Sequence, residues 1–454
     1  MPKGEHQKEK KYTVWQLANV LIIAVGVLVT AILLVFLQRP TVSETEQREL
    51  TKFPEFSWES LFSGEYTAQI SEFYNDTIPN RDSFKQLTAV IRKSMGISVG
   101  GVTIQGDIQK ITTEAYDEPE DTVATSSTAA ENSGDVSEEK TTEVTTEEIT
   151  EATTERPANE IAPGVITNGQ IIAYIDGNYR AISLYGGGSG KNYASYVNEF
   201  AERLDGVNVY SMVVPTSGAY YTPSNFDEYN ASHLDSINSI NSKLSDKVTA
   251  VDGYSALLEH VDEDIYLRTD HHWAPLGAYY AAQAFAEAAG VPFADISTME
   301  RRDIEGYVGT MYSFTQSADL LNDPEVFTYY VPANDFRAYY YDTAYNYDGQ
   351  YPFFLQMPVS SSYSTFMGGD QKIVRIDTDV DNGRVLAVFK DSYGNAEIPF
   401  YFGSFSSVYV LDMRYFDLSV DFLKEQGVTD LLFTMCTFSA VGDNAEDLNT
   451  ILSR

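Results

Sequence analysis

Cysteine and histidine are both scarce in this sequence. There is one cysteine, Cys436, among 454 residues, which rules out a disulfide within the chain and a zinc site built on several cysteines. Chemistry that needs an imidazole has five candidates: His6, His233, His260, His271 and His272. A search for a functional site can therefore concentrate on the surroundings of a few residues.

Positive charge is also in short supply. The chain has 30 lysine and arginine residues against 66 aspartate and glutamate residues, so its net charge is −36. A surface of this sign repels the phosphate backbone of DNA and RNA. We therefore expect no nucleic-acid partner.

The chain has one long uncharged run, near its N-terminus. Its apolar part, Leu17–Leu37, would span roughly 31 Å as a helix, which matches the hydrocarbon core of a membrane. Lysines precede the run and acidic residues soon follow it. The positive-inside rule then predicts a cytoplasmic tail at residues 1–12, a transmembrane anchor at 13–38 and an extracellular remainder. A cleaved signal peptide is the competing interpretation, but no small-x-small site follows the run.

The anchor and the low cysteine content together suggest a compartment. A large exported domain with one cysteine is typical of bacteria that do not depend on disulfides. We therefore expect a single-pass protein in the cell membrane of a bacterium, with its main domain outside the cell.

Two regions of different character follow the anchor. Residues 41–112 form a membrane-proximal region, in which 41–98 have an amphipathic, helix-like pattern broken at Pro79 and Asn80. Residues 113–160 are interpreted as a disordered acidic linker, because residues 114–155 contain fourteen acidic residues and one lysine, and repeats such as TTEVTTEEITEATTE have almost no apolar residue. Such a segment cannot bury enough surface to offset its chain entropy. Its composition suits either a spacer or a loop insertion.

From residue 161 onward, apolar β-branched runs alternate with helical patterns. Strands are predicted at 207–217, 384–390, 407–413 and 428–438, and helices at 191–204, 234–246, 274–290 and 420–427. This alternation is typical of an α/β fold with a mainly parallel sheet covered on both faces. The tyrosine-rich stretch 329–354 predicts a β-hairpin flap with ordinary aromatic packing, although its rings would also suit contacts with sugars.

One polar motif directly follows a predicted strand. It reads Lys390-Asp391-Ser392-Tyr393-Gly394-Asn395. Functional groups collect at the carboxyl ends of strands in parallel sheets, but a serine there is more often only a turn or cap residue. A serine hydroxyl becomes a nucleophile when a base removes its proton. Ser217, in a Pro-Thr-Ser loop after another strand, is the rival nucleophile.

The base would come from a second motif, Arg268-Thr269-Asp270-His271-His272-Trp273. In an extended loop, residues two apart project to the same side, which places Asp270 beside His272. The carboxylate would hold one ring nitrogen of His272 while the other faces Ser392, as in a Ser-His-Asp triad. A metal site at Asp270, His271 and His272 is the alternative interpretation, but adjacent ligands rarely converge and no second histidine cluster supplies the rest.

Neighbouring residues would complete the site. The backbone N–H of Ser392 is the expected oxyanion donor. Trp273 and Tyr393 are candidates for substrate contact, with Trp273 as a wall of the pocket. Arg414 follows the strand predicted at 407–413, where it would add positive charge at the same edge.

The strings TDHHW, before a Gly-Ala-Tyr helix, and KDSYGNA, after a strand, resemble the DHHW family of exported bacterial proteins. That family is similar to the SGNH-like domains of the alginate O-acetylation proteins. The resemblance covers the anchor, the 41–98 region and nearly all of 165–454. It implies an SGNH-hydrolase-like three-layer α/β/α sandwich in which Asp270 and His272 precede the nucleophile, Ser392. The Gly-Asp-Ser block of SGNH esterases is absent, and the second oxyanion donor stays unassigned.

These features predict a membrane-anchored O-acyltransferase that acts outside the cytoplasm. It would O-acetylate a cell-envelope polysaccharide without a cofactor. The resemblance implies that a multi-pass membrane-bound O-acyltransferase supplies the acyl group. The alternatives are a carbohydrate esterase with the same triad and a non-catalytic polysaccharide-binding or scaffold protein.

Overall fold

The computed structural model describes residues 159–454 and, before them, residues 39, 42–43, 48–49, 52–54, 56–57, 65–77 and 103–105. The chain divides into two compact units, Met1–Ile97 with Gln316–Ala318 and Ser98–Thr315 with Asp319–Arg454. In the part of the chain that is described, no helix combines the length and the apolar character needed to cross a membrane. The tail predicted at 1–12 and the anchor predicted at 13–38 lie outside the described residues.

Among its described residues, the first unit contains a helix that follows the predicted amphipathic pattern. This helix, α3, spans Glu65–Asp76 and ends before Pro79, so part of the amphipathic pattern predicted at 41–98 is helical. The strands β1 (Val42–Ser43) and β2 (Arg48–Glu49) pair antiparallel in the same unit.

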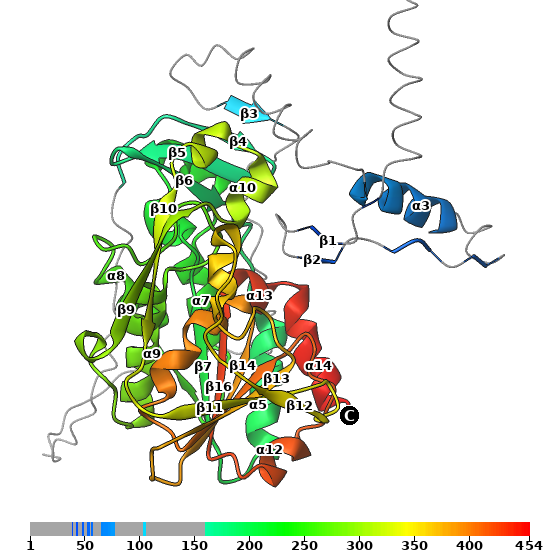
Figure 1. Cartoon of the computed structure of the whole chain (residues 1–454), viewed down its shortest axis with the longest axis vertical. Helices are drawn as coiled ribbons and strands as arrows, with labels where there is room; N and C mark the ends of the chain where they lie inside the picture. Colours follow the sequence, from blue (N-terminus) through cyan, green and yellow to red (C-terminus); the bar gives the residue numbers. More distant parts are fainter. Residues whose placement is uncertain are drawn as a thin grey trace, which may run out of the picture. The chain divides into compact units, whose positions relative to one another are not determined.

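An eight-stranded sheet forms the centre of the second unit (Figure 1). Its spatial order is β12 (Tyr347–Tyr351), β11 (Phe336–Tyr341), β13 (Ile373–Thr378), β15 (Ser407–Asp412), β14 (Val385–Lys390), β16 (Asp430–Cys436), β7 (Asn208–Val214) and β8 (Val248–Ala250). The four strands predicted from apolar runs are β7, β14, β15 and β16. These strands are almost fully buried, which is why their sequences are continuously apolar.

The sheet is mixed, so the prediction of a mainly parallel sheet is correct for only part of it. The strands β15, β14, β16, β7 and β8 run parallel to one another. The strands β13, β11 and β12 are added antiparallel at one edge. Residues 336–351 of the tyrosine-rich stretch form a hairpin, as predicted, but this hairpin is part of the central sheet and adds two antiparallel strands to it. The beginning of the stretch belongs to β10.

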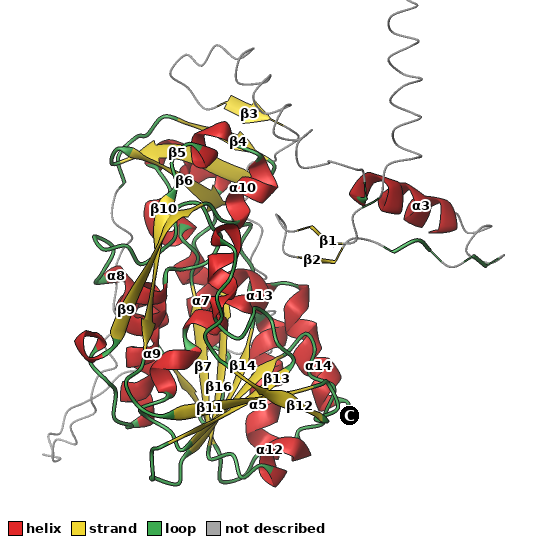
Figure 2. Cartoon of the chain, in the orientation of Figure 1, coloured by secondary structure: helices red, strands yellow, loops and turns green. Residues whose placement is uncertain are grey.

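Helices cover both faces of this sheet (Figure 2). On β7, Tyr210 packs against Phe285 of one layer, whereas the adjacent Ser211 bonds to the hydroxyl of Tyr193 in the other. This alternation is what a strand between two layers requires. The described helices after residue 159 are α5 (Lys191–Arg203), α6 (Gly218–Tyr221), α7 (His233–Asn241), α8 (Gly253–Leu258), α9 (Pro275–Ala289), α10 (Thr310–Thr315), α11 (Ala318–Leu321), α12 (Asp421–Glu425), α13 (Thr437–Val441) and α14 (Glu446–Leu452). Of these, α10 and α11 do not belong to the layers on this sheet, because their apolar residues cluster with Ile172 and Ala181.

Two smaller sheets accompany the central one. The strands β9 (Glu300–Tyr307) and β10 (Glu325–Val331) form an antiparallel ribbon. The strands β3 (Thr103–Gln105), β4 (Gly164–Thr167), β5 (Gln170–Ile175) and β6 (Asn178–Ser183) form a four-stranded sheet in that order. Since β3 pairs with β4, the two flanks of the acidic segment predicted at 113–160 are neighbours in one sheet.

Candidate active site

The turn that carries the predicted nucleophile, Ser392, begins where β14 ends, and we call residues 391–396 the nucleophile turn. Ser392 opens a short 3-10 helix, η4 (Ser392–Ala396), which Asp391 caps by accepting a hydrogen bond from the backbone N–H of Tyr393 at 2.9 Å. The other oxygen of the Asp391 carboxylate accepts from the N–H of Cys436 at the end of β16, at 3.0 Å. The turn is thereby fixed to the carboxyl end of the neighbouring parallel strand, and Ser392 itself remains partly exposed.

Residues 267–272 form a loop that carries both histidines of the motif, the histidine loop. A short antiparallel bridge between Tyr266 and Trp273 closes it. The N–H of Ala274 also donates to the carbonyl of Ile265 at 2.9 Å. Helix α9 begins immediately afterwards, and a Cβ at Gly277 would lie 2.3 Å from the same carbonyl oxygen. The glycine therefore allows the helix to approach the base of the loop.

The two motifs meet at His272. Its Nδ1 lies 2.6 Å from Asp270 Oδ1, and its Nε2 lies 2.8 Å from Ser392 Oγ. Asp270 and His272 are 1 % and 6 % exposed. With a proton on Nδ1, the imidazole donates to the carboxylate and accepts from the serine hydroxyl, which is the hydrogen-bonding pattern of a general base.

Asp270 is held by more contacts than the sequence suggested. Its Oδ2 accepts from the hydroxyl of Tyr307 at 2.7 Å and from the N–H of Thr310 at 2.9 Å. Burial alone would raise the pKa of Asp270, but the positive charge and hydrogen bond of His272 outweigh burial and hold that pKa well below its usual value. A Cβ at Gly309 would lie 2.3 Å from Oδ2, so this position needs a glycine.

His271 is turned toward a different partner. Its Nδ1 lies 2.5 Å from the hydroxyl of Thr310, as expected for a residue that makes a structural hydrogen bond. Its ring nevertheless contacts that of His272, with centroids 3.8 Å apart. Burial and the charge of His272 lower the pKa of His271 to about 3, so this imidazole stays neutral.

Trp273 and Tyr393 lie under the site rather than in its wall. Trp273 is fully buried, and its indole N–H donates to the carbonyl of Tyr393 at 2.9 Å. Tyr393 is 2 % exposed, and its hydroxyl donates to the carbonyl of His271 at 2.5 Å. Both side chains join the histidine loop to the nucleophile turn. The prediction that Trp273 lines the pocket is wrong because no part of its indole is accessible.

Arg414 does not bring uncompensated charge to the site. Its guanidinium donates twice to Asp412, at 2.8 and 2.6 Å, and contacts Asp370 at 2.8 Å. Buried Lys390 pairs with the same two carboxylates. Two cations therefore face two anions, and the added positive charge predicted at this edge is neutralised. The network reaches the nucleophile turn through Asn395, whose amide donates to Asp370 at 2.8 Å.

The predicted oxyanion donor remains available. Among the described residues, the backbone N–H of Ser392 has no acceptor. The rival nucleophile, Ser217, lies at the start of α6 and is 4 % exposed. The ring nitrogen of His272 that faces away from Asp270 is directed at Ser392 and not at Ser217.

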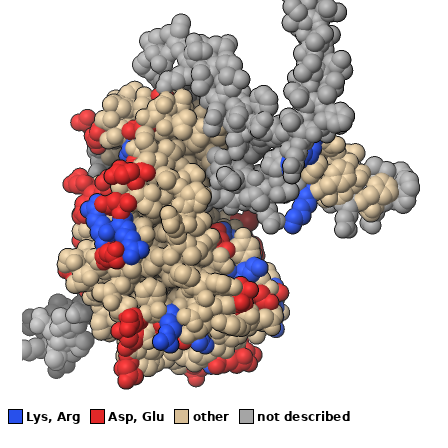
Figure 3. Space-filling view, viewed as in Figure 1, with Lys and Arg blue, Asp and Glu red and all other residues tan. Residues whose placement is uncertain are grey.

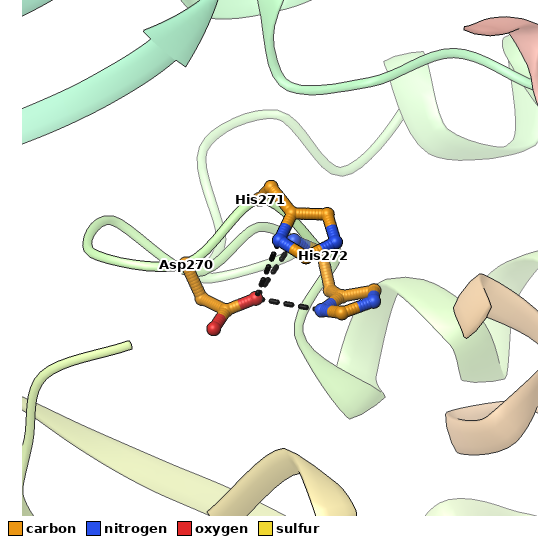
Figure 4. A group of neighbouring side chains, drawn as sticks. All are labelled: Asp270, His271 and His272. Carbon is orange, nitrogen blue, oxygen red and sulfur yellow. Dashed lines mark hydrogen bonds and ion pairs between the residues drawn. The ribbon is translucent and has the colours of Figure 1, made fainter. Parts of the chain in front are cut away.

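Asp270, His271 and His272 also form a group whose ligand atoms lie within 4.8 Å of one another (Figure 4). The figure shows Oδ1 of Asp270 facing both imidazoles. These atoms already serve as hydrogen-bonding partners for one another, for Thr310 and for Ser392. The contacts thus favour a proton relay over a metal site.

Several residues of the site were missed from the sequence. Tyr307, Gly309 and Thr310 surround Asp270, Asp370 joins the charged network, and Tyr363 stacks on His272. They lie in segments that carry no motif, and only the three-dimensional pairing of those segments with the loop reveals them.

Comparisons with known proteins agree with the two motifs. The family described as DHHW protein matches residues 46–411. A crystal structure of a DHHW family protein from Eubacterium siraeum is 57 % identical, covers 64 % of this chain and 99 % of its own, and has a TM-score of 0.63. PatB1 of Bacillus cereus, solved with a sulfonyl adduct, is 19 % identical over 61 % of this chain and 98 % of its own, with a TM-score of 0.49.

The O-acetyltransferase domain of AlgJ from Pseudomonas putida is 17 % identical, covers 58 % of this chain and 90 % of its own, and has a TM-score of 0.36. No curated protein matches the sequence. The resemblance inferred from TDHHW and KDSYGNA is confirmed, and the chain belongs to the DHHW family.

Proposed function

We propose that this protein is a serine O-acyltransferase that O-acetylates a cell-envelope polysaccharide from an anchor in the cell membrane. The observation that carries the chemistry is the position of His272 between Asp270 and Ser392. The export of the domain, the polysaccharide acceptor and the membrane-bound O-acyltransferase that supplies the acyl group rest on the sequence and on the family resemblance.

The reaction proceeds in two steps. Ser392 Oγ attacks the acyl carbonyl, its proton passes to His272 Nε2, and the protonated imidazole gives this proton to the leaving group. In the second step a sugar hydroxyl attacks the Ser392 ester, its proton passes to His272, and His272 returns a proton to Ser392. Asp270 holds Nδ1 throughout, and the N–H of Ser392 faces the developing oxyanion.

Hydrolysis of a chromogenic acetyl ester by the full-length chain tests this function. We expect measurable turnover by the unsubstituted chain and a loss of about 10³-fold or more in Ser392→Ala. Ser217→Ala is the matched control, because it removes the hydroxyl of the rival candidate serine, and it should keep its activity. A sulfonyl fluoride should label the unsubstituted chain at Ser392.

The molecule that accepts the acetyl group from Ser392 distinguishes a transferase from an esterase. With an acetylated Ser392 in hand, release of the acetyl group to an added glycan supports the transferase, and release to water alone supports the esterase. Absence of turnover in every protein, with retained glycan binding, would identify a scaffold instead.

A further inference from the structure

Tyr363 contacts both halves of the site from a third segment of the chain. It lies in the 3-10 helix η3 (Val359–Thr365) and is 4 % exposed. Its ring stacks on the imidazole of His272, with centroids 3.8 Å apart and 7° between the planes. Its hydroxyl is 3.1 Å from the carbonyl oxygen of Ser392 and 3.0 Å from that of Tyr393. One side chain thus covers the face of the base and holds the backbone of the nucleophile turn.

We propose that Tyr363 is a positioning residue that stabilises the protonated form of His272 with its ring and holds the Ser392 turn with its hydroxyl. The inference rests on the proposed acyl transfer, in which the proton of Ser392 moves to Nε2 as the ester bond forms. The imidazole is then a cation against the negative face of an aromatic ring, an attractive arrangement. The stack is therefore stronger after proton transfer than before it.

Among the described groups around His272, Tyr363 is the one whose ring stacks on the face of the imidazole. Those facing the imidazole are Asp270 and His271 from its own loop, Ser392 and Tyr393 from η4, and Asp370, which follows η3. Asp270 supplies charge in the plane of the ring, and neutral His271 supplies none. Burial raises the pKa of Tyr363 well above its usual value, so its hydroxyl stays a neutral donor.

Two substitutions separate the ring from the hydroxyl. Tyr363→Leu removes the π face, and Tyr363→Phe keeps it. Since the chain has five histidines, labelling with ¹³Cε1-histidine gives few imidazole resonances, and His272→Gln identifies the one from His272. In the full-length chain, we expect the titration midpoint of this resonance to fall by about half a unit to one unit in Tyr363→Leu and to stay constant in Tyr363→Phe.

A matched control removes another buried ring. Tyr329 contacts Phe327 and Phe366 in the adjoining aromatic cluster, and Tyr329→Leu should leave the midpoint unchanged. If Tyr363→Leu does not fold, Tyr363→Met replaces it, because the unbranched methionine side chain adapts to irregular spaces and has no π face. A constant or raised midpoint in the folded variant overturns the inference.

Kinetics distinguish this failure from failure of the proposed function. With the acetyl ester, kcat should fall about 3- to 30-fold in Tyr363→Leu, and the acid limb of the pH profile should move to lower pH. The midpoint shift requires no turnover. If it occurs while no protein hydrolyses the ester, the proposed function is wrong and the stabilisation of the imidazolium stands.

Discussion

Asp270 shows how a single carboxylate can depend on several segments of the chain. It accepts hydrogen bonds from His272, Tyr307 and Thr310 while being almost completely buried. A buried carboxylate of this kind costs free energy unless every acceptor position is used. Its role in the site is to fix the imidazole, so a variant of the same shape should disable catalysis without unfolding the chain.

Asp270→Asn tests this role. The amide cannot accept as a carboxylate does, and it favours the wrong tautomer of His272. We expect ester hydrolysis to fall about 10³- to 10⁴-fold, while the far-ultraviolet circular dichroism spectrum is unchanged. Full activity in this variant would exclude Asp270 from the proposed mechanism.

Glu397 is a second buried carboxyl group, outside the triad. It is inaccessible to solvent, and it accepts hydrogen bonds from Tyr401 and from Thr434. Burial, with a smaller contribution from the charge of Asp391, raises the pKa of Glu397 to about 7. The folded chain therefore binds this proton more tightly than the unfolded chain, in which the pKa is about 4.3.

The sign of the resulting pH dependence follows directly. The stability that the proton contributes is complete below about pH 4 and is lost as the pH rises toward 7. Glu397→Gln imitates the protonated acid at every pH. Relative to the unsubstituted chain, its free energy of unfolding should therefore rise between pH 4 and pH 8, by a change on the order of 3 kcal/mol. Urea unfolding at both pH values measures this change, and a constant difference would contradict the prediction.

At this scale the sequence predicted the contacts among Ser392, His272 and Asp270 better than the residues that surround them. Ser392, His272 and Asp270 stand in two short motifs, and the i, i+2 spacing was enough to pair the correct histidine with the carboxylate. Trp273 and Arg414 were misplaced because sequence does not show whether a polar group is already paired. The sequence pattern is the same whether an indole is buried under a turn or exposed, and whether a guanidinium lies between two carboxylates or is unpaired.

The histidine loop depends on the β9–β10 ribbon as a whole element. At one end of the ribbon, Tyr307 and Glu325 are cross-strand partners. Tyr307 donates to Asp270, and the carboxylate of Glu325 accepts from the N–H of Thr269 at 2.7 Å. The ribbon therefore presents one acceptor and one donor to successive residues of the loop, and it fixes the orientation of the triad from outside.

Gly309, two residues after the end of β9, lies against Asp270 of the loop. A Cβ there would come within 2.3 Å of Asp270 Oδ2 and 2.6 Å of its Cβ, so Gly309→Ala must displace the carboxylate. We expect ester hydrolysis to fall about 10²-fold with little change in fold, because a displacement of about 1 Å has that effect on a catalytic geometry.

Gly186→Ala is the control for this change. No atom lies within 4 Å of the Cβ that it would introduce, so its activity and its Tm should stay close to those of the unsubstituted chain. Equal activity in both glycine variants would show that the loop tolerates movement of Asp270.

The elements themselves were largely predictable where burial was complete. The apolar runs at 384–390, 407–413 and 428–438 became β14, β15 and β16 because both faces of these strands are covered. Helix α9 ends at Gly290, as its C-terminal glycine indicated. The strands β11 and β12 were not assigned to the sheet, because partly exposed, tyrosine-rich strands have the same sequence pattern in a separate flap and near the edge of a sheet.

For the whole molecule, charge is the property that stands out. On the face drawn in Figure 3, most basic side chains of the described residues lie beside acidic ones. Part of the net charge of −36 comes from residues 114–155, whose fourteen acidic residues and one lysine contribute 1 − 14 = −13. Removing this segment would leave −36 + 13 = −23, with the same paired surface on the rest.

Deletion of residues 114–155 tests whether the segment contributes to folding. Because its composition offers almost nothing to bury, we expect Tm to change by less than about 2 °C and ester hydrolysis to be unchanged. A deletion extended through Thr103–Gln105 is the contrast, since it removes the strand that pairs with β4, and it should lower Tm. A large loss of stability in the shorter deletion would contradict the compositional prediction.

The pairing of β3 with β4 has a consequence for how this chain can vary. Because these strands are hydrogen-bonded neighbours, the distance between the points where the intervening tract leaves and re-enters the sheet is set by their pairing and not by the length of the tract. Insertions, deletions and changes of charge between the two strands can therefore accumulate without moving β4 from its place in the sheet.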